Sequence, residues 1–218
     1  MKKSTLFIIS YCMLNSLNSC KKDNNNQIGN NQYEKISKKI MKDNLPFTSE
    51  NIKNFYKIDK DSISYIINNS NRQINIIKGD EMDKSIAIKE NEFDIKPKDE
   101  NIYYEIETFK FSETNTGKLI LYNTFGENDI KILNVQLNSY VNNILVDKLL
   151  LDCRFSFETQ YFRTFKINKE KNIEIIKLSI NSLEYNEAGD IIGEKQNADT
   201  IKVKVDYDID AKGYFIKK

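Results

Sequence analysis

The chain of 218 residues contains no histidine and no tryptophan, and only two prolines and seven glycines. Without histidine, Ser-His-Asp and Cys-His catalysis are excluded, together with the commonest zinc sites. The absence of tryptophan disfavours the indole platforms often used to stack sugars, although 12 tyrosines remain. We expect neither a metal ion nor a cofactor.

An excess of charge of either sign is also lacking. The chain has 33 basic and 32 acidic residues, and the two signs are interleaved along it. Interleaved charges are typical of an ordinary solvated surface. A protein that binds the phosphate backbone usually has a basic patch, so we expect no nucleic-acid partner.

Long apolar runs are missing as well, and the longest one opens the chain. Lys2 and Lys3 precede an apolar stretch from Leu6 to Leu14 that only Ser10 interrupts, and small or polar residues then lead to Cys20. A basic start, a short apolar run and a small-residue cleavage region are typical of an export signal. The run is shorter than the roughly 18 to 20 residues that span a bilayer.

The four residues Leu17-Asn18-Ser19-Cys20 resemble the lipobox of bacterial lipoproteins, from which Asn18 is a mild departure. The resemblance implies cleavage between Ser19 and Cys20 and attachment of lipid, such as palmitate, to the Cys20 thiol. Two or more acyl chains hold a protein stably at a membrane. An ordinary secretory signal is the alternative. The following Lys21-Lys22-Asp23 is similar to the start of surface-exported lipoproteins of the Bacteroidetes, which implies the outer membrane and exposure at the cell surface.

Three segments are therefore expected: a lipoprotein signal peptide at 1–19, a lipidated cysteine with a flexible tether at 20–32, and a single β-rich domain at 33–218. The tether has the composition KKDNNNQIGNNQ after the cysteine, which is too polar to bury a core. The remaining 186 residues suffice for one substantial core.

The domain is predicted to begin with one or two short helices and to continue in strands. Residues 33–43 have the spacing of an amphipathic helix, and a second helix is expected to start at Thr48 or Ser49 with Ile52 and Phe55 on one face. Alternating apolar and polar residues then predict antiparallel strands, at 102–111, 118–125, 144–153, 161–167 and 200–210. The expected fold is an antiparallel β-meander that forms a sandwich or a partly open barrel.

Residues 130–139 resemble residues 173–182, 43 residues later, and suggest two similar hairpins. In both copies the apolar positions change phase at the same step, between Ile132 and Leu133 and between Ile175 and Ile176. One extra residue reverses the face that a strand presents to the core, so the shared change suggests a shared β-bulge. The period in the low forties also occurs in propellers, but too few units are visible.

The densest aromatic cluster lies in CRFSFETQYFRTF at 153–165, where two arginines accompany the rings. Tyr, Phe and Arg are favoured at the centres of interfaces. The candidate interaction patch consists of Arg154, Phe157, Tyr161 and Arg163. The alternative is a hairpin core with a cation–π rim. Cys153, in a strand-like apolar stretch, is expected to be a buried structural thiol.

Acidic residues give weaker patterns. Asp206, Asp208 and Asp210 alternate, but a calcium-binding loop of the EF-hand type needs glycine and glutamate where Ala211 and Lys217 stand, so we expect three solvated aspartates. Glu105 with Glu107, and Glu92 with Asp94, form carboxylate pairs on strand faces, and no catalytic residue is assigned.

The sequence thus favours a membrane-anchored lipoprotein of the cell envelope that binds a partner without catalysis. Its partners are expected to be the membrane, through lipid on Cys20, and an envelope or extracellular protein or glycan. Two other functions are retained. One is a hydrolase that uses two carboxylates on glycans, and the other is an inhibitor or protective factor that binds another protein.

Overall fold

The computed structural model describes residues 44–59, 63–68, 75–77, 82 and 84–218. This part of the chain is mainly β-sheet, as the sequence predicts. The predicted helix at 33–43, the signal peptide, Cys20 and the tether lie outside the described residues. The strands are β1 (Phe47–Thr48), β2 (Tyr56–Asp59), β3 (Ser64–Ile67), β4 (Asn75–Ile77), β5 (Ile88–Lys89), β6 (Tyr103–Lys110), β7 (Asn115–Phe125), β8 (Lys131–Val141), β9 (Ile144–Ser156), β10 (Gln160–Ile167), β11 (Asn172–Tyr185), β12 (Ile191–Ile209) and β13 (Phe215–Lys217).

Eleven strands form one sheet whose hydrogen-bonded order is β13-β12-β11-β10-β9-β8-β7-β6-β4, with β1 beside β10 and β5 beside β9. Strands β2 and β3 form a separate hairpin. All pairings are antiparallel except that of β5 with β9. The strands at the two ends of the order, β13 and β4, do not pair with each other, so the sheet remains open. This agrees with the predicted sandwich or partly open barrel.

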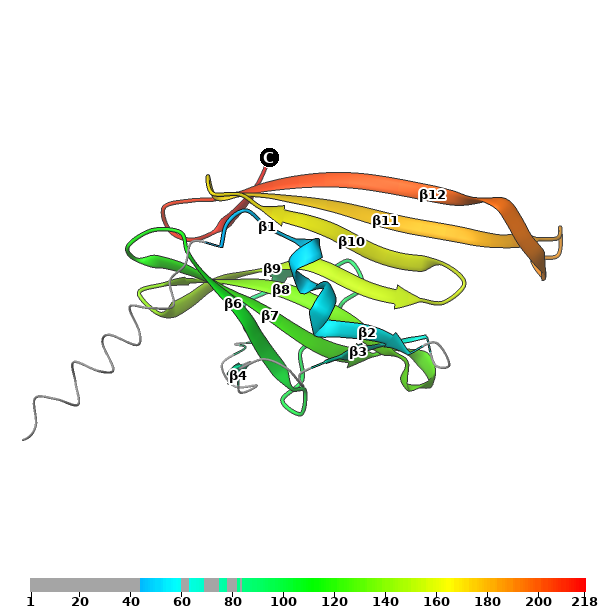
Figure 1. Cartoon of the computed structure of the whole chain (residues 1–218), viewed down its shortest axis with the longest axis horizontal. Helices are drawn as coiled ribbons and strands as arrows, with labels where there is room; N and C mark the ends of the chain where they lie inside the picture. The colour runs from blue at the N-terminus through cyan, green and yellow to red at the C-terminus, as the bar shows by residue number, and fades with distance from the viewer. Residues whose placement is uncertain (1–43, 60–62, 69–74, 78–81, 83) are drawn as a thin grey trace, which may run out of the picture. The chain divides into compact units, whose positions relative to one another are not determined.

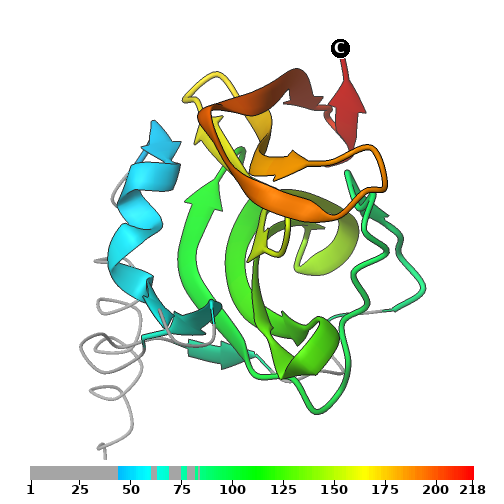
Figure 2. The same cartoon turned by 90° about the vertical axis from the view of Figure 1, so that its right-hand side faces the viewer.

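The sheet folds over on itself at the β9–β10 hairpin. These two strands pair only next to their turn, at Phe155–Ser156 and Gln160–Tyr161, and then separate. Strands β10–β13 consequently lie across β6–β9 (Figures 1 and 2). The main hydrophobic core fills the space between the two halves, and its members include Leu121, Val135, Leu149, Phe165, Ile175 and Val205.

A second core lies on the opposite face of β7–β9. It contains Tyr122, Ile132, Leu150 and Cys153 from the strands, and the segment between β4 and β6 covers them with residues such as Ile95. Both faces of β8 are therefore buried. Ile132 belongs to the second core, whereas Leu133, Val135 and Leu137 belong to the main core, which explains the phase change noted in the sequence.

The predicted β-bulges at the repeated step do not exist. β8 pairs with β7 without a register shift across Ile132 and Leu133. β11 pairs regularly with β10 and with β12 across Ile175 and Ile176. The prediction was wrong because it assumed that each strand has only one apolar face.

A 3-10 helix, η1 (Ser49–Phe55), lies beside the sheet at the position predicted for the second helix (Figure 2). Thr48 is its N-cap: the backbone N–H of Glu50 donates to Thr48 Oγ1 at 3.3 Å, and Thr48 N–H donates to Asn51 Oδ1 at 2.8 Å. Ile52 and Phe55 point into the main core, as expected.

Removing this cap gives a direct test of its contribution. Thr48→Ala is expected to lower the free energy of unfolding by about 1 kcal/mol, because the N–H of Glu50 loses its acceptor. Urea unfolding followed by circular dichroism measures the change. Thr48→Ser keeps the hydroxyl and should stay within about 0.5 kcal/mol of the parent chain. Equal losses in both variants would show that the methyl group, not the cap, contributes the stability.

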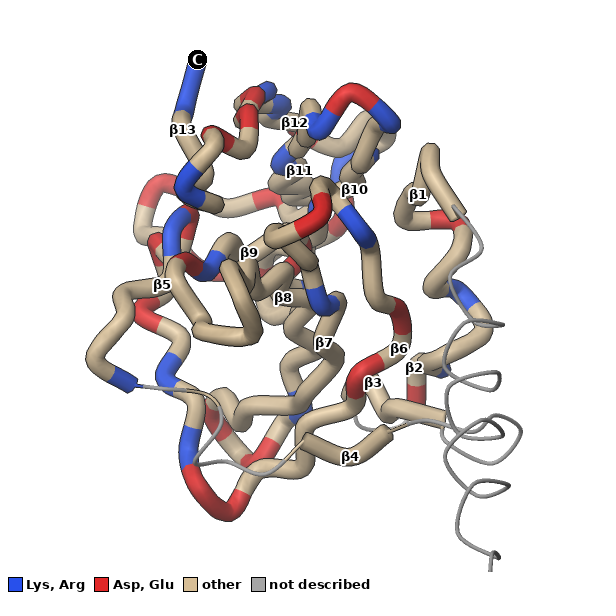
Figure 3. The backbone as a smooth tube through the Cα atoms, turned by 90° about the vertical axis from the view of Figure 1, so that its left-hand side faces the viewer, with Lys and Arg blue, Asp and Glu red and all other residues tan. Residues whose placement is uncertain are grey.

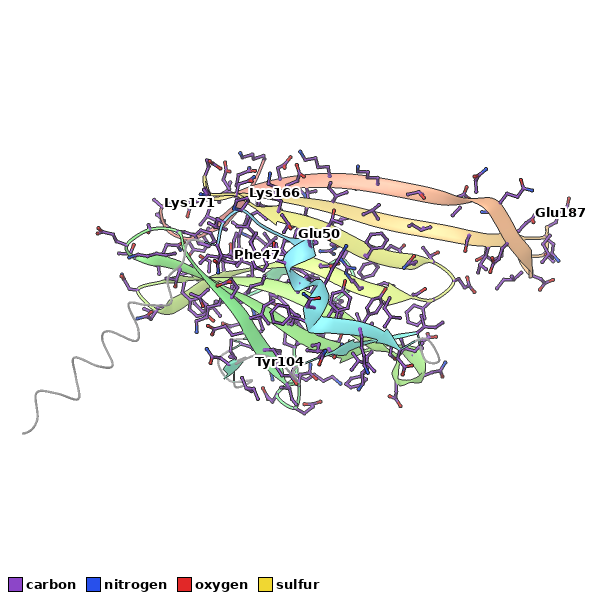
Figure 4. The ribbon with its side chains drawn as sticks, viewed as in Figure 1. Phe47, Glu50, Tyr104, Lys166, Lys171 and Glu187 are labelled. Atoms are coloured by element: carbon purple, nitrogen blue, oxygen red, sulfur yellow. The ribbon has the colours of Figure 1, made fainter. Side chains whose placement is uncertain are left out.

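The β11–β12 hairpin extends beyond its neighbours. Pairing of β11 with β10 ends at Ile180, whereas pairing with β12 continues to Tyr185. The hairpin therefore projects as a two-stranded ribbon whose tip carries Glu187 (Figures 1 and 4). At the other end of the same strands Phe47 of β1 lies opposite Ile167 of β10, beside Lys166 (Figure 4).

Lysine, arginine and acidic residues are interspersed along the described backbone (Figure 3). Among the described residues, no helix has the length and apolar character that a membrane span requires.

Candidate functional site: an aromatic cluster between two cavities

The segment that follows β5 is a closed turn at residues 90–95. The side chain of Asn91 holds it by donating to the carbonyl of Ile95 at 2.9 Å and accepting from the N–H of Ile95 at 2.7 Å. Asp94 N–H donates to the carbonyl of Asn91 at 3.1 Å. Glu90 and Asp94 have φ values of 56° and 50°, which are uncommon for residues other than glycine. The turn therefore has one defined shape, and Phe93 is at its exposed end.

Glu90 fixes the start of the turn to β11–β13. Its carboxylate lies 2.5 Å from Lys177 Nζ and 2.9 Å from Lys217 Nζ, and it accepts a hydrogen bond from the Tyr207 hydroxyl. Burial alone would raise the pKa of Glu90, but the hydrogen bonds from Lys177, Tyr207 and Lys217 outweigh it and lower the pKa from 4.5 to about 2. Burial and the hydrogen bond to Glu90 raise the pKa of Tyr207.

Glu92 fixes the middle of the turn to β10 and β11. Its carboxylate lies 2.8 Å from the Arg163 guanidinium and 2.9 Å from Lys177 Nζ. Arg163 is buried, and it also donates to the carbonyls of Leu150 and Glu90, each at 2.8 Å. One arginine thus joins β9, β10 and the turn.

Phe93 belongs to an aromatic cluster, defined here as Phe93, Phe155, Phe157 and Tyr161. The Phe93 ring meets those of Phe155 and Tyr161 edge to face, with centroids 4.9 and 5.0 Å apart. Phe155 and Phe157 are 5.5 Å apart. Phe155 is buried in the second core, whereas Phe93 and Phe157 are 38% and 43% exposed. The cluster therefore presents two rings to solvent on a fixed base.

The first cavity, of about 470 Å³, lies on one side of Phe93. Its walls are largely apolar, and Asp94, Lys96 and Lys98 add charges. Asp94 is 2.7 Å from Lys96 Nζ. The apolar lining consists of Phe93, Ile95, Phe125, Ile132, Phe155 and Phe157.

The second cavity, of about 300 Å³, also has Phe93 in its lining. Ile201 and Val203 of β12 line it together with Tyr161, and the ion-paired Arg163, Lys177 and Glu92 contribute charged groups. The charged groups of this cavity are paired with one another, so its apolar side chains are the part available to a partner.

The structure brings three of the four predicted patch residues to this region. Phe157 lines the first cavity, and Tyr161 and Arg163 line the second. Arg154 lies elsewhere, because alternate residues of β9 point to opposite faces. Its guanidinium lies over the rings of Tyr56 and Phe162, 5.3 and 5.6 Å from their centroids.

Arg154 instead accompanies a buried carboxylate. Its Nε donates to Asp152 at 2.5 Å, and the N–H of Arg163 donates to the same carboxylate at 2.7 Å. Burial raises the pKa of Asp152, although Arg154 opposes the shift. Asp152 has no exposed surface, so it is part of the framework below the cluster.

The predicted carboxylate pairs separate in the structure. A bulge at Ile106 sets Glu105 opposite Ile120 and Glu107 opposite Leu119, which belong to different cores, so the two carboxylates lie on opposite faces rather than on one. Glu92 lines the second cavity, whereas Asp94 lines the first.

The three alternating aspartates each have other partners. Asp206 lies 3.5 Å from Lys204 Nζ and Asp208 lies 2.9 Å from Lys218 Nζ, while Asp210 accepts from backbone N–H groups of its own turn. Within the part of the chain that the structure describes, no group of three or more His, Cys, Asp or Glu residues is placed to hold a metal ion.

Cys153 is buried in the second core, as predicted for a structural thiol. Burial raises its pKa to about 12, an effect that Arg163 partly offsets. A thiol with this pKa is almost entirely protonated at neutral pH and is a poor nucleophile.

Sequence reasoning missed Phe93, Phe125, Ile201 and Val203 as site residues. Phe93 lies between Glu92 and Asp94 in ENEFDIK, and an isolated aromatic residue between two acidic residues is the only signal that the sequence offers. Ile201 and Val203 alternate with polar residues, a pattern that predicts side chains facing a core. Whether they are buried or exposed depends on how far the opposing strands β6–β9 extend, which the pattern does not show.

Comparison with protein-family models, with curated proteins and with solved structures finds no match for this chain.

Proposed function

We propose that the chain is a bacterial lipoprotein, held at the outer membrane by lipid on Cys20, which binds a partner through the aromatic cluster and does not catalyse a reaction. The lipobox-like Leu17-Asn18-Ser19-Cys20 and the preceding apolar run support the anchor. The exposed rings of Phe93 and Phe157, set between two cavities with apolar walls, carry the binding function.

The rigidity of the cluster supports binding. Aromatic residues contribute most at interfaces when they are anchored and next to pockets that exclude water. The Phe93 ring contacts Phe155 edge to face, and the ion-paired carboxylates of Glu90 and Glu92 fix the part of the turn that precedes it. Little conformational entropy is then lost when a partner covers the ring. The partner is an envelope or extracellular protein or glycan.

Photo-crosslinking in cells of a bacterium that makes the protein tests both parts of the proposal. p-Benzoylphenylalanine is placed at Phe157 and, as the control, at Tyr214, which has the same exposure of 43% but lies in the β12–β13 turn. We expect an adduct of defined mass from position 157 and none from position 214. The adduct should stay in the membrane fraction, and Cys20→Ala should release the chain from it.

The crosslinking yield tests the binding surface, and the membrane association of Cys20→Ala tests the lipid anchor, so either part of the proposal can be rejected without the other. Adducts of equal yield from both positions, or from neither, would reject the aromatic cluster as the binding surface. A Cys20→Ala chain that remains with the membrane would reject the lipid anchor and leave the binding surface untouched.

A further inference from the structure

Strand β12 has a long edge beside which no other described strand lies. One side pairs with β11, whereas on the other side β13 pairs only with Tyr207–Ile209. Among the described residues, the edge from Ile191 to Asp206 has no strand beside it. The carbonyl of Asp206 accepts from Lys218 N–H on this side, so by alternation the N–H and C=O groups of Thr200, Lys202 and Lys204 also point outward.

The inner face of this edge is apolar. Val205 is buried in the main core, but the next inward residues, Val203 and Ile201, are 48% and 65% exposed. Both line the second cavity. A strand added to this edge would place its alternate side chains beside them, because opposed residues of paired strands share a face.

The outer face of the edge carries two lysines, which disfavour pairing with a second copy. Lys202 and Lys204 are exposed there, and Lys204 is ion-paired with Glu174 at 2.7 Å and with Asp206 of the same face at 3.5 Å. Two copies paired antiparallel about Ile201 would bring their Lys202 side chains to diagonal positions, where like charges repel. Lysines on sheet edges are a common protection against self-association. An incoming strand with acidic residues on this face would be complementary.

We infer that an extended segment of a partner protein adds to β12 at Thr200–Lys204 as a further antiparallel strand. Its alternate apolar side chains enter the second cavity beside Ile201 and Val203, and its acidic side chains lie against Lys202. Recognition of this kind takes affinity from main-chain hydrogen bonds and specificity from pockets for alternate side chains. The inference rests on the proposed binding function and names its partner as a protein segment that alternates apolar and acidic residues.

The test uses the full chain and a fluorescein-labelled peptide, Glu-Val-Glu-Val-Glu-Val-Glu, in fluorescence anisotropy. Glutamates opposite Lys202 and its outward-facing neighbours direct their N–H groups toward β12. N-methylation of these glutamates should weaken binding by about tenfold or more, because each methyl group removes a main-chain donor. N-methylation of the valines, whose N–H groups point away, should change the affinity by less than about threefold.

Charge variants of the peptide and of the protein test the expected preference for acidic side chains. Replacing the glutamates of the peptide with lysines should weaken binding by about tenfold, and Lys202→Glu should reverse this preference. The matched control is Lys212→Glu, an exposed lysine in the β12–β13 turn, which should leave the preference unchanged.

Three results would overturn the inference: equal binding of the two N-methylated peptides, an unchanged preference in Lys202→Glu, or no anisotropy change up to about 1 mM protein. Each would leave the proposed function standing if position 157 still crosslinks in cells. Loss of the crosslink together with peptide binding at β12 would instead reject the aromatic cluster and retain the edge.

Discussion

Arg163→Ala is expected to lower the free energy of unfolding by about 3 to 5 kcal/mol, the largest effect we anticipate for a single polar side chain here. The Arg163 guanidinium donates to the carbonyls of Leu150 and Glu90 and pairs with Glu92. Alanine removes the donor that these two carbonyls share, and a buried acceptor without a partner is costly. Urea unfolding at neutral pH measures the loss.

Two further variants show whether the stability lost in Arg163→Ala comes from the geometry of the guanidinium or from its charge alone. Arg163→Lys keeps the charge but not the planar fork, so it should lose about half as much stability as alanine. Lys84→Ala breaks an exposed ion pair with Asp99 and should cost less than about 1 kcal/mol. If Arg163→Ala lost no more stability than Lys84→Ala, the guanidinium would not be a structural link between the turn, β9 and β10.

Glu90→Gln is expected to lower the free energy of unfolding by about 3 kcal/mol at pH 7. The carboxylate is 7% exposed, and its pKa falls from 4.5 to about 2 on folding. A lowered carboxyl pKa adds stability that is fully present above the unfolded value. This stability is lost as the pH falls from about 4.5 towards 2. The parent chain and Glu90→Gln should therefore converge in stability at acid pH.

Urea unfolding of both chains at a series of pH values between 7 and 2 checks this expectation. The control is Glu50→Gln, because Glu50 forms an exposed i, i+3 pair with Lys53 and should contribute less than about 0.5 kcal/mol. A difference between the parent chain and Glu90→Gln that stays constant with pH would indicate that packing, not ionisation, explains the effect.

The strands were the most predictable part of the fold. Alternation placed elements at 118–125, 144–153 and 161–167, and the structure has β7, β9 and β10 there. The period of two reports directly which residues face a core. The N-terminal half of β12, residues 191–199, was missed because it has no sustained apolar alternation. Within it, Ile191, Gly193, Glu194 and Asp199 pair with β11, and the register shifts between Glu194 and Asp199.

The number of cores was not predictable from the pattern. A strand that is buried on both faces has apolar residues in both phases, and β8 was therefore interpreted as bulged. Whether a second layer covers the other face depends on the segment between β4 and β6, whose Met82 and Ile95 belong to the second core although they are distant in sequence from β7–β9. Short strands such as β5 and β13 give too little pattern to be recognised.

The candidate site was predicted in part. The aromatic density of 153–165 pointed to Phe157, Tyr161 and Arg163, which the hairpin places together. Phe93 joins them only because Glu90 and Glu92 reach across to Arg163 and Lys177, more than 70 residues later in the chain. Long-range ion pairs of this kind leave no local trace in a sequence.

Because Cys153 is buried, the reactivity of its thiol can report local opening of the second core. Cys153 borders the second cavity but is only 1% exposed, and the folded protein holds its thiol protonated, so a thiol reagent reaches the sulfur readily only when the side chains around it move apart. The rate of labelling under native conditions therefore counts openings of the layer that carries the aromatic cluster. With a partner bound, Cys153 should be labelled more slowly. The ratio of the two labelling rates then measures how strongly the partner stabilises the packing of the turn against the sheet.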